Sequence, residues 1–404
     1  MIAIVATAAA AFDVDAATRA YLATFNGAAR AKSDAYFEGG YWLILWNAVV
    51  GIGITWTFLH FGYAARLSAW ATRVTGTRRW LATLLWAVGF LVVTSLAGFP
   101  WTTYTDFFRE HQYGMSNQNF AQWLGDWAKN FAIGTPVSAL IVTAIIAGVR
   151  RSPHRWWVYA GAGTVVVLAF FIAVGPVLIE PLFNKYTPMA ASPLRTDIIR
   201  LAQGNGVPVT NVFVANASRQ TSRVSANVAG IGPTARVALS DNLLNTHDDA
   251  GTLAVMGHET GHYVLNHIVS LIVGFSLIIV IGLAVVQAAV PALIARNPGW
   301  GVTGIIDPAA VAVAVIVLTL FFLAVTPITN SLIRFHESQA DIFGLNAARA
   351  PDGFARTALR LGQYRKLEPT PFEEAVFFDH PSGYTRIHQA MAWKAAHLGE
   401  PGMQ

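Results

Sequence analysis

The chain has 404 residues, of which 54% are hydrophobic and only 12% are charged. Soluble domains carry about 25% charged residues, so this composition and a mean hydropathy of +0.46 favour a multi-span membrane protein over two or three soluble domains. The absence of cysteine excludes disulfides and thiolate metal sites. The net charge of +5 does not indicate a nucleic-acid partner, because no basic stripe interleaved with aromatic residues accompanies it.

Residues 1–40 form an N-terminal lead before the first predicted span. They begin MIAIVATAAAAFDVD, an apolar run that is too short to cross a bilayer. Small residues before Phe12 are typical of the end of a signal peptide, but the basic start of such a peptide is missing. A cleaved signal, a short hydrophobic lead and a misassigned start all remain open.

Six later stretches are long and apolar enough to cross a bilayer, which takes about 20 residues. They are residues 41–63, 80–99, 131–149, 157–179, 268–294 and 308–328. The alternative, six buried helices of a soluble protein, is disfavoured because so many apolar runs are hard to bury in a chain of this length. We therefore predict a mostly α-helical membrane bundle, with four spans within 41–179 and two within 268–328.

Residues 180–267, between the fourth and fifth spans, are mixed and polar, and they predict a small α+β subdomain outside the membrane. VFVANA (212–217) and ARVALSD (235–241) have the β-branched and apolar content of strands. Thr246 and Asp249 have the spacing of a capping box and predict the start of the helix that follows. Beyond the last span, residues 329–404 predict a polar, mostly helical tail.

Residues 258–262 read His-Glu-Thr-Gly-His and predict a metal site on that helix. Histidines four residues apart project from one helical face, because 3.6 residues make a turn. His258 and His262 can therefore share one ion, and Glu259 can act as general base on a water held there. In a chain without cysteine, the ligands must be His, Asp or Glu, and we predict one Zn²⁺ per chain.

A third protein ligand is needed, because a catalytic zinc usually has three and keeps one position open. RFHESQADIFG (334–344) places Glu337 and Asp341 four residues apart on one helical face, just past the last span. We predict Glu337 as that ligand, and Asp341 as acceptor of the second ring N–H of a ligating histidine. The alternative is that these carboxylates lie on an ordinary solvated helix face, which would be the favoured interpretation for a single glutamate.

Two further histidines lie close to these motifs. For His267, with Asn266 before it, we expect local capping or interfacial roles and no metal ligation. His380 in FDHPSGYTRI is a candidate electrophile for the oxyanion of the reaction, with Arg386 six residues later. Taken alone, a His-Pro pair in a tail is usually a turn.

These segments together resemble the integral-membrane zinc metallopeptidases that include the type I CAAX prenyl endopeptidases. Further carriers of the resemblance are LAGFPWTTYTDFFREHQYGMSNQ (96–118), EPLFNKYTPM (180–189) and ARVALSDNLL (235–244). They precede HETGHYVLNH (258–267), RFHESQAD and HPSGYTRI in the family's order, and the likeness covers about residues 41–395. It implies zinc ligation by His258, His262 and Glu337, with Glu259 as base, Asp341 behind the ligands, and His380 and Arg386 lining the substrate groove.

The chain departs from the family in two places. Members often have a seventh span at the N-terminus, whereas only six can be defended here. The segment before Arg236 often carries an Asn-Ala-aromatic run, whereas here it reads Ser225, Ala226, Asn227 and Val228. We expect this segment to be an edge strand that binds the substrate backbone by strand addition; the altered side chains leave the sequence preference open.

The function that these observations favour is a zinc-dependent membrane endopeptidase. It would cleave peptide or protein substrates near their C-terminus, and the resemblance implies prenylated CAAX peptides. One alternative is a quality-control metalloprotease with unprenylated substrates. A non-catalytic zinc-binding scaffold is disfavoured by Glu259, since a scaffold needs no base, and a transporter by spans almost free of ionisable residues.

Loop charges bear on the orientation of this multi-pass protein, which we place in a bacterial inner membrane. The loops after the first and third spans are basic, with Arg66, Arg73, Arg78, Arg79, Arg150, Arg151 and Arg155. The positive-inside rule makes those loops cytoplasmic, so the zinc site would face away from the cytoplasm. The resemblance points the other way, because eukaryotic family members are expected to face the cytosol. The oligomeric state is not predicted.

Overall fold

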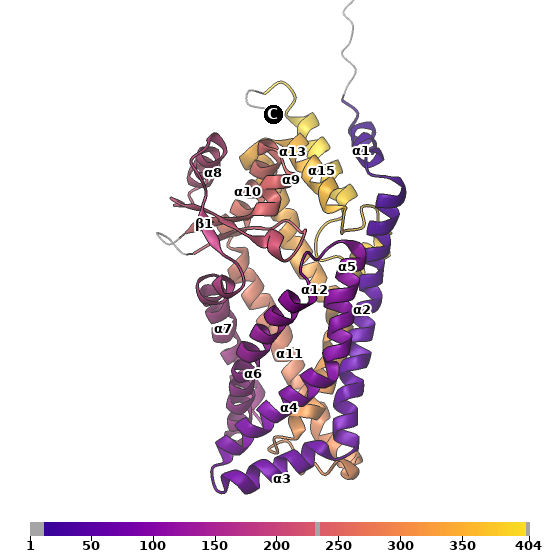
Figure 1. Cartoon of the computed structure of the whole chain (residues 1–404), viewed down its shortest axis with the longest axis vertical. Helices are drawn as coiled ribbons and strands as arrows, with labels where there is room; N and C mark the ends of the chain where they lie inside the picture. Colours follow the sequence, from indigo (N-terminus) through magenta and orange to yellow (C-terminus); the bar gives the residue numbers. More distant parts are fainter. Residues whose placement is uncertain (1–11, 231–234, 401–404) are drawn as a thin grey trace, which may run out of the picture.

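The computed structural model describes residues 12–230 and 235–400. Long helices run along the long axis of the molecule, and a small sheet with shorter helices covers one end of them (Figure 1). Residues 1–11, which carry the predicted signal-like run and any seventh span, lie outside the described residues. The mostly helical fold with a small α+β part is confirmed.

Six helices of the described chain are long and apolar enough to cross a membrane. They are α2 (Gly27–His60), α4 with its continuation (Arg79–Tyr113), α6 (Phe120–Arg151), α7 (Trp156–Val174), α11 (His267–Arg296) and α12 (Ala310–Ala348). All six predicted spans are confirmed as such helices. Two of the helices extend far beyond the apolar stretch, so the proposed boundaries at 40 and 328 fall inside α2 and α12.

The second spanning helix continues past an internal proline. Helix α4 itself is Arg79–Thr103; a π-helical turn, Tyr104–Phe108, then leads into α5 (Arg109–Tyr113). Pro100 lacks a backbone N–H and its ring crowds the preceding turn, yet the helix continues through it. At the opposite end of the bundle, the short helix α3 (Tyr63–Thr75) lies across the long helices (Figure 1).

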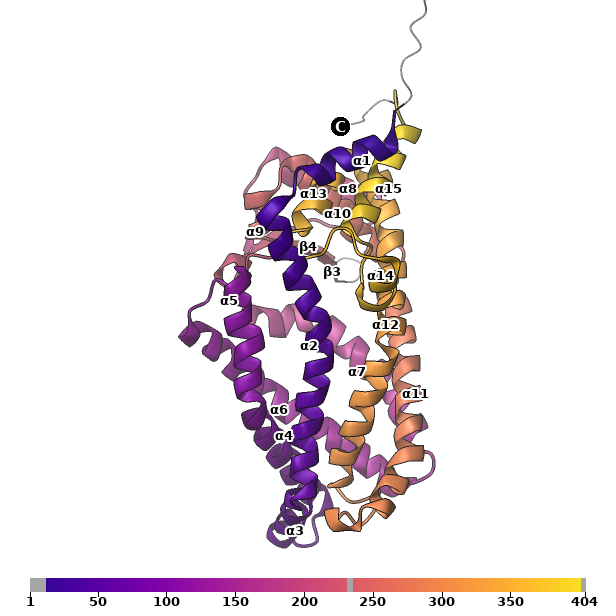
Figure 2. The same cartoon turned by 90° about the vertical axis from the view of Figure 1, so that its right-hand side faces the viewer.

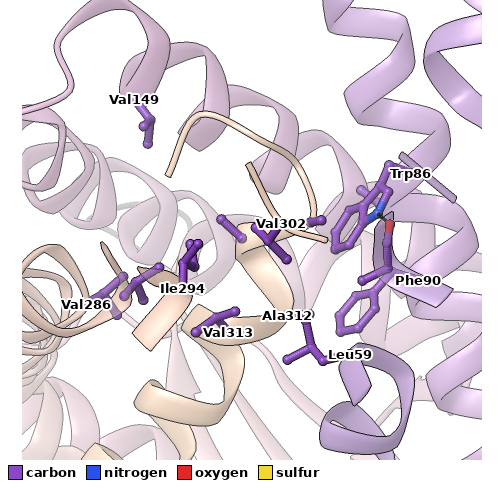
Figure 3. Close-up of a cluster of buried hydrophobic side chains, with 14 of the residues drawn as sticks. Leu59, Trp86, Phe90, Val149, Val286, Ile294, Val302, Ala312 and Val313 are labelled. Carbon is purple, nitrogen blue, oxygen red and sulfur yellow. Dashed lines mark hydrogen bonds between the residues drawn. The ribbon is translucent and has the colours of Figure 1, made fainter. Parts of the chain in front are cut away.

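The core of the bundle is close to α3, and Figure 3 shows part of it. Trp86 is fully buried and stacks on Phe90, while its indole N–H donates to the carbonyl of Ala64 at 3.0 Å. Small buried residues such as Ala310 and Ala312 let α12 approach its neighbours closely. This end is therefore held together mainly by van der Waals packing.

A four-stranded sheet forms the centre of the subdomain. Its strand order is β1-β2-β4-β3, from β1 (Tyr186–Pro188), β2 (Val212–Ala215), β3 (Ala226–Ala229) and β4 (Arg236–Ser240). β2 and β4 are parallel, and the outer pairs are antiparallel. The strands predicted within 212–217 and 235–241 are confirmed. Helix α8 (Pro193–Gly204) packs on the sheet through buried Ile198 and Ala202.

The zinc-motif helix begins later than the capping pattern predicts. Thr246 ends the short helix α9 (Asp241–Thr246), where its hydroxyl donates to the carbonyl of Asn242 at 2.7 Å. Helix α10 (Asp249–Val264) is capped instead by Asp248, whose carboxylate accepts the N–H of Gly251 at 2.8 Å. The predicted Thr246 cap is therefore wrong, because its hydroxyl is already bonded within the preceding helix.

The first and last described helices meet above the bundle. Helices α13 (Pro351–Leu361), α14 (Pro371–Phe377) and α15 (Gly383–Ala396) follow α12, and α1 (Val14–Ala23) lies beside α15 (Figure 2). Leu22 of α1 shares a buried cluster with Phe354 and Ile387. This cap holds the upper half of α12 against α10, which positions the site described next.

Candidate metal centre

Helices α10 and α12 touch backbone to backbone at a pair of glycines. A Cβ added at Gly344 would lie 2.8 Å from the backbone nitrogen of His258, and one added at Gly257 would lie 2.9 Å from the carbonyl oxygen of Gly344. Neither position has room for a side chain. The close crossing brings the histidine face of α10 against Glu337 and Asp341 of α12.

Three predicted ligands converge at this crossing. His258 Nε2 lies 3.0 Å from His262 Nε2 and 3.2 Å from Glu337 Oε2, and His262 Nε2 lies 3.4 Å from Glu337 Oε1. Nitrogen and oxygen ligands of tetrahedral zinc stand about 3.3 Å apart, since each bond is about 2.0–2.1 Å long. The donor atoms and their spacing therefore fit a zinc ion.

Asp341 and Arg386 fix the orientation of this cluster. The Nδ1 atom of His258 lies 2.8 Å from Asp341 Oδ1, which leaves Nε2 to face the other two ligands. The Arg386 guanidinium donates two hydrogen bonds of 2.8 Å to Asp341 and one of 3.4 Å to Glu337. Asp341 is fully buried and Arg386 nearly so, so the arginine compensates carboxylates that would otherwise be costly to bury.

The charges around α10 shape the chemistry of its side chains. Burial disfavours the protonated ring of His258, but hydrogen bonds to Asp341 and Glu337 outweigh it and raise its pKa to about 10. The site is thus rich in negative charge and suited to a cation. Burial also raises the pKa of Glu259 above its ordinary value, although the two motif histidines act against it. A carboxyl group shifted in this direction suits proton transfer near neutral pH.

The sequence interpretation missed a partner of His262. His267 is almost fully buried, with its Nδ1 2.9 Å from His262 Nδ1 and its Nε2 3.2 Å from Gln339 Oε1. Asn266 has a left-handed backbone (φ 54°) between α10 and α11 and makes no side-chain capping hydrogen bond to α11, but it turns His267 back towards the site. An asparagine that breaks an apolar run just before a histidine was the available signal.

His380 also reaches the cluster, from the turn before α15. Its Nε2 lies 3.2 Å from Glu337 Oε2, and its Nδ1 lies 2.7 Å from the carboxylate of Asp379, which was not predicted to contribute. Burial lowers the pKa of His380 despite the opposing hydrogen bond to Asp379. A neutral imidazole held in this way can donate one hydrogen bond to an oxygen beside the cluster.

A pocket opens beside Glu259. It is lined by His258 and Glu337 of the metal cluster, by residues of α13, and by Val224, Ser225 and Ala226. Asn227 and Val228, the other two predicted substrate-binding residues, do not line it. They belong to β3, an edge of the sheet, so the structure brings together only part of the predicted substrate strand at the pocket itself.

The free edge of β3 offers main-chain hydrogen bonds. Ser225 is bonded to Ser240 of β4 through both its N–H and its carbonyl, and pairs in an antiparallel ladder alternate. The main-chain groups of Ala226 and Val228 therefore point away from β4, towards the outer edge. Within residues 12–230 and 235–400, no strand pairs with that edge.

Comparison with protein families gives matches over nearly the whole chain. Residues 19–185 match a family described as the CAAX prenyl protease N-terminal region with five membrane helices. Among the described residues, this range contains four of the candidate spans and the short helix α3. Residues 188–394, more than half of the chain, match peptidase family M48.

Individual relatives agree with this assignment. An uncharacterised metalloprotease of Bacillus subtilis is 29% identical, over 84% of this chain and 81% of its own. A CAAX prenyl protease 1 homologue of Arabidopsis thaliana is 27% identical, over 76% and 73% respectively. The crystal structure of S. mikatae Ste24p has the same fold, with a TM-score of 0.73, 20% identity and coverage of 94% of both chains.

The metal cluster, the apolar helices and the family matches lead to one assignment. Members of the M48 family depend on zinc, and the His258, His262 and Glu337 group supplies donors that fit it. The chain belongs to peptidase family M48 and is a zinc-dependent metalloendopeptidase of the multi-pass membrane type.

Proposed function

We propose that this enzyme cleaves peptide or protein substrates near their C-terminus, as the names of its CAAX prenyl protease relatives suggest. The observation that carries the proposal is one pocket lined by Glu259, by His258 and Glu337 of the metal cluster, and by Ala226 at the start of the edge strand. A scaffold would need the ligands alone. A peptidase needs all three parts, because it must hold an extended backbone beside a base and an electrophile.

Each residue of the cluster has a proposed role. His258, His262 and Glu337 hold zinc, which when bound supplies a Lewis acid for the scissile carbonyl and for the attacking water. Glu259 accepts the proton of that water and passes it to the leaving amine. Asp341 fixes the ring of His258, a role supported by their 2.8 Å contact and by the raised pKa of His258.

The remaining groups bind the substrate. The substrate backbone pairs with the outward main-chain groups of Ala226 and Val228. The main-chain groups of Ser225 and Asn227, which alternate with them, face β4 instead. His380 donates from Nε2 to the developing oxyanion, while Asp379 holds its other nitrogen. Arg386 keeps Asp341 and Glu337 in place from behind and lines the same pocket.

Purified enzyme given a farnesylated CAAX peptide and its unmodified counterpart tests the substrate class. We expect faster cleavage of the farnesylated peptide, and loss of both reactions when a chelator removes zinc. Equal cleavage of the two peptides would contradict a prenyl requirement and assign the enzyme to unprenylated substrates. Chelator-resistant cleavage would contradict the zinc mechanism itself.

We further propose that the six helices sit in a bacterial inner membrane with the zinc site outside the cytoplasm. Their outward faces are apolar, with residues such as Leu140, Val166 and Val273 exposed. Helix α3 and the basic loops lie at one end, and the sheet lies at the other (Figure 1). A reporter that fluoresces only in the cytoplasm, fused at the C-terminus, should stay dark. Fluorescence would contradict this orientation.

A further inference from the structure

Arg365 is a partly buried cation in the wall of the active-site pocket. It follows α13 and lines the same pocket as His258 and Glu259. Its guanidinium makes no hydrogen bond or ion pair with any residue in 12–230 or 235–400. A guanidinium carries five N–H donors in a rigid fork. The donors of Arg365 are therefore available to bind a ligand beside the reacting groups.

Three other cations near the pocket have charged partners. Arg386 binds Asp341 and Glu337, and Arg223 binds Glu110 at 2.6 Å. Lys366, the next residue after Arg365, binds both Glu38 and Glu373. Arg365 therefore differs from these three neighbours, whose charges are already compensated.

The charge of Arg365 is only partly compensated by its surroundings. Burial and the charge of Arg386 lower the pKa of its guanidinium, while Asp379 and Glu337 offset only part of this effect. Asp379 is already hydrogen-bonded by His380 at 2.7 Å. A cation in such a place gains most from a planar anion that arrives with the ligand, because guanidinium and carboxylate match in two parallel hydrogen bonds.

Several other residues that line the pocket of Arg365 are apolar. Phe354, Ala358 and Leu361 recur at helical spacing on α13, and Leu243 and Val255 line the pocket as well. A ligand that reaches from Glu259 to Arg365 would therefore place an apolar side chain against this wall. Its charged group would then meet the guanidinium.

We propose that Arg365 binds a carboxylate of the peptide substrate, so that the pocket selects an apolar residue close to a negatively charged group. The inference rests on the proposed peptidase function and narrows its substrate class. The carboxylate has two possible sources, the free C-terminus of the substrate or an acidic side chain. Arg365 is in either case a specificity-determining residue, and it takes no part in bond cleavage.

The test compares three peptides of one sequence: a free C-terminal acid, a C-terminal amide, and an amide that carries Glu near its end. We expect the wild-type enzyme to cleave the best carboxylate peptide about tenfold to a hundredfold better in kcat/KM than the plain amide, mainly through KM. Arg365→Gln should abolish most of that preference, and Arg365→Lys should restore part of it. The matched control, Arg360→Gln, changes an exposed arginine near the end of α13, five residues before Arg365, and should keep the preference.

The outcomes separate the two proposals. Preference for the free acid assigns the C-terminus as the carboxylate source, and preference for the Glu peptide assigns a side chain. An acid-to-amide ratio that is the same in wild type and Arg365→Gln, or a wild type without any preference, would overturn the role of Arg365 while cleavage still supports a peptidase.

A binding measurement tests the Arg365 site even if the enzyme cleaves none of these peptides. Zinc-loaded Glu259→Gln protein, with and without Arg365→Gln, is titrated with the same fluorescently labelled peptides. A carboxylate preference that disappears with Arg365→Gln supports the site even if the wild type cleaves none of the peptides, which would contradict the peptidase proposal alone. Equal binding of acid, Glu and amide peptides would overturn the carboxylate site.

Discussion

The two halves of helix α12 are held in the molecule by different forces. Its first half contributes Ala310, Ala312 and Val313 to an apolar cluster among the spans. Its second half buries Glu337 and Asp341 among histidines and an arginine (Figure 2 shows the whole helix beside α11). One continuous helix thus joins a region of apolar packing to a region of compensated charge.

The two regions should respond differently to mutation. Van der Waals contacts are individually weak and numerous, so the apolar half can lose one contact at small cost. The charged half has few groups, and each compensates another: Arg386 serves two carboxylates, and His258 binds both of them. Removing one partner there leaves a buried charge, which costs about 3–5 kcal/mol.

The largest effect is expected from Glu337→Ala. This change removes a proposed zinc ligand and leaves Arg386 and His380 without one of their acceptors. Elemental analysis should find the protein depleted of zinc, with peptide cleavage below about one thousandth of wild type. Glu368→Ala, which alters an exposed glutamate paired only with Arg30, is the control. Normal zinc content in Glu337→Ala would show that another residue is the third ligand.

Glu259→Gln should reduce activity almost as much by a different route. The amide keeps the size of the side chain but accepts no proton, so cleavage should fall by roughly 10²–10⁴-fold. Zinc content should stay at the wild-type level, because Glu259 is not in the ligand group. Cleavage at an undiminished rate would remove Glu259 from the role of base.

Much of the charged half could be predicted from sequence because its parts lie at helical spacing. The i, i+4 pairs of His258 with His262 and of Glu337 with Asp341 each share one helix face, and each pair lies beside an apolar run. Hydropathy likewise located all six spans. In both cases the signal is local, so a short window of sequence contains it.

The missing parts depend on contacts between distant segments. His267 reaches His262 only because the chain turns at Asn266, and Arg365 enters the pocket only because α13 folds back over α10. Hydropathy also ended the last span at residue 328, whereas the helix continues to Ala348. A helix can continue beyond its apolar residues, because contacts with other segments stabilise its buried polar residues. A hydropathy scale does not include such contacts.

Asp341→Asn should weaken zinc binding without abolishing it. The amide oxygen can still accept from His258, but the negative charge that faces Arg386 is lost. Residues that orient a metal ligand typically change metal affinity by about 10–100-fold. Titration with a competing chelator measures this affinity, and a shift smaller than about twofold would show that Asp341 does not support the histidine.

The smallest effects should still separate the two regions, through a pair of glycine substitutions. In Gly344→Ala the new methyl group meets the backbone of His258 at 2.8 Å, and backbone cannot rotate away. Helices α10 and α12 must separate, at a cost of about 1–3 kcal/mol, and zinc affinity should fall several-fold as Glu337 moves from the histidines.

In Gly134→Ala, on spanning helix α6, the methyl group meets nothing within 4 Å, so stability should stay within about 0.5 kcal/mol and zinc affinity should not change. Chelator titration and thermal unfolding of both variants measure the contrast. Equal zinc affinity in the two would mean that the metal site tolerates a shift of its helices, and that the close crossing serves packing alone.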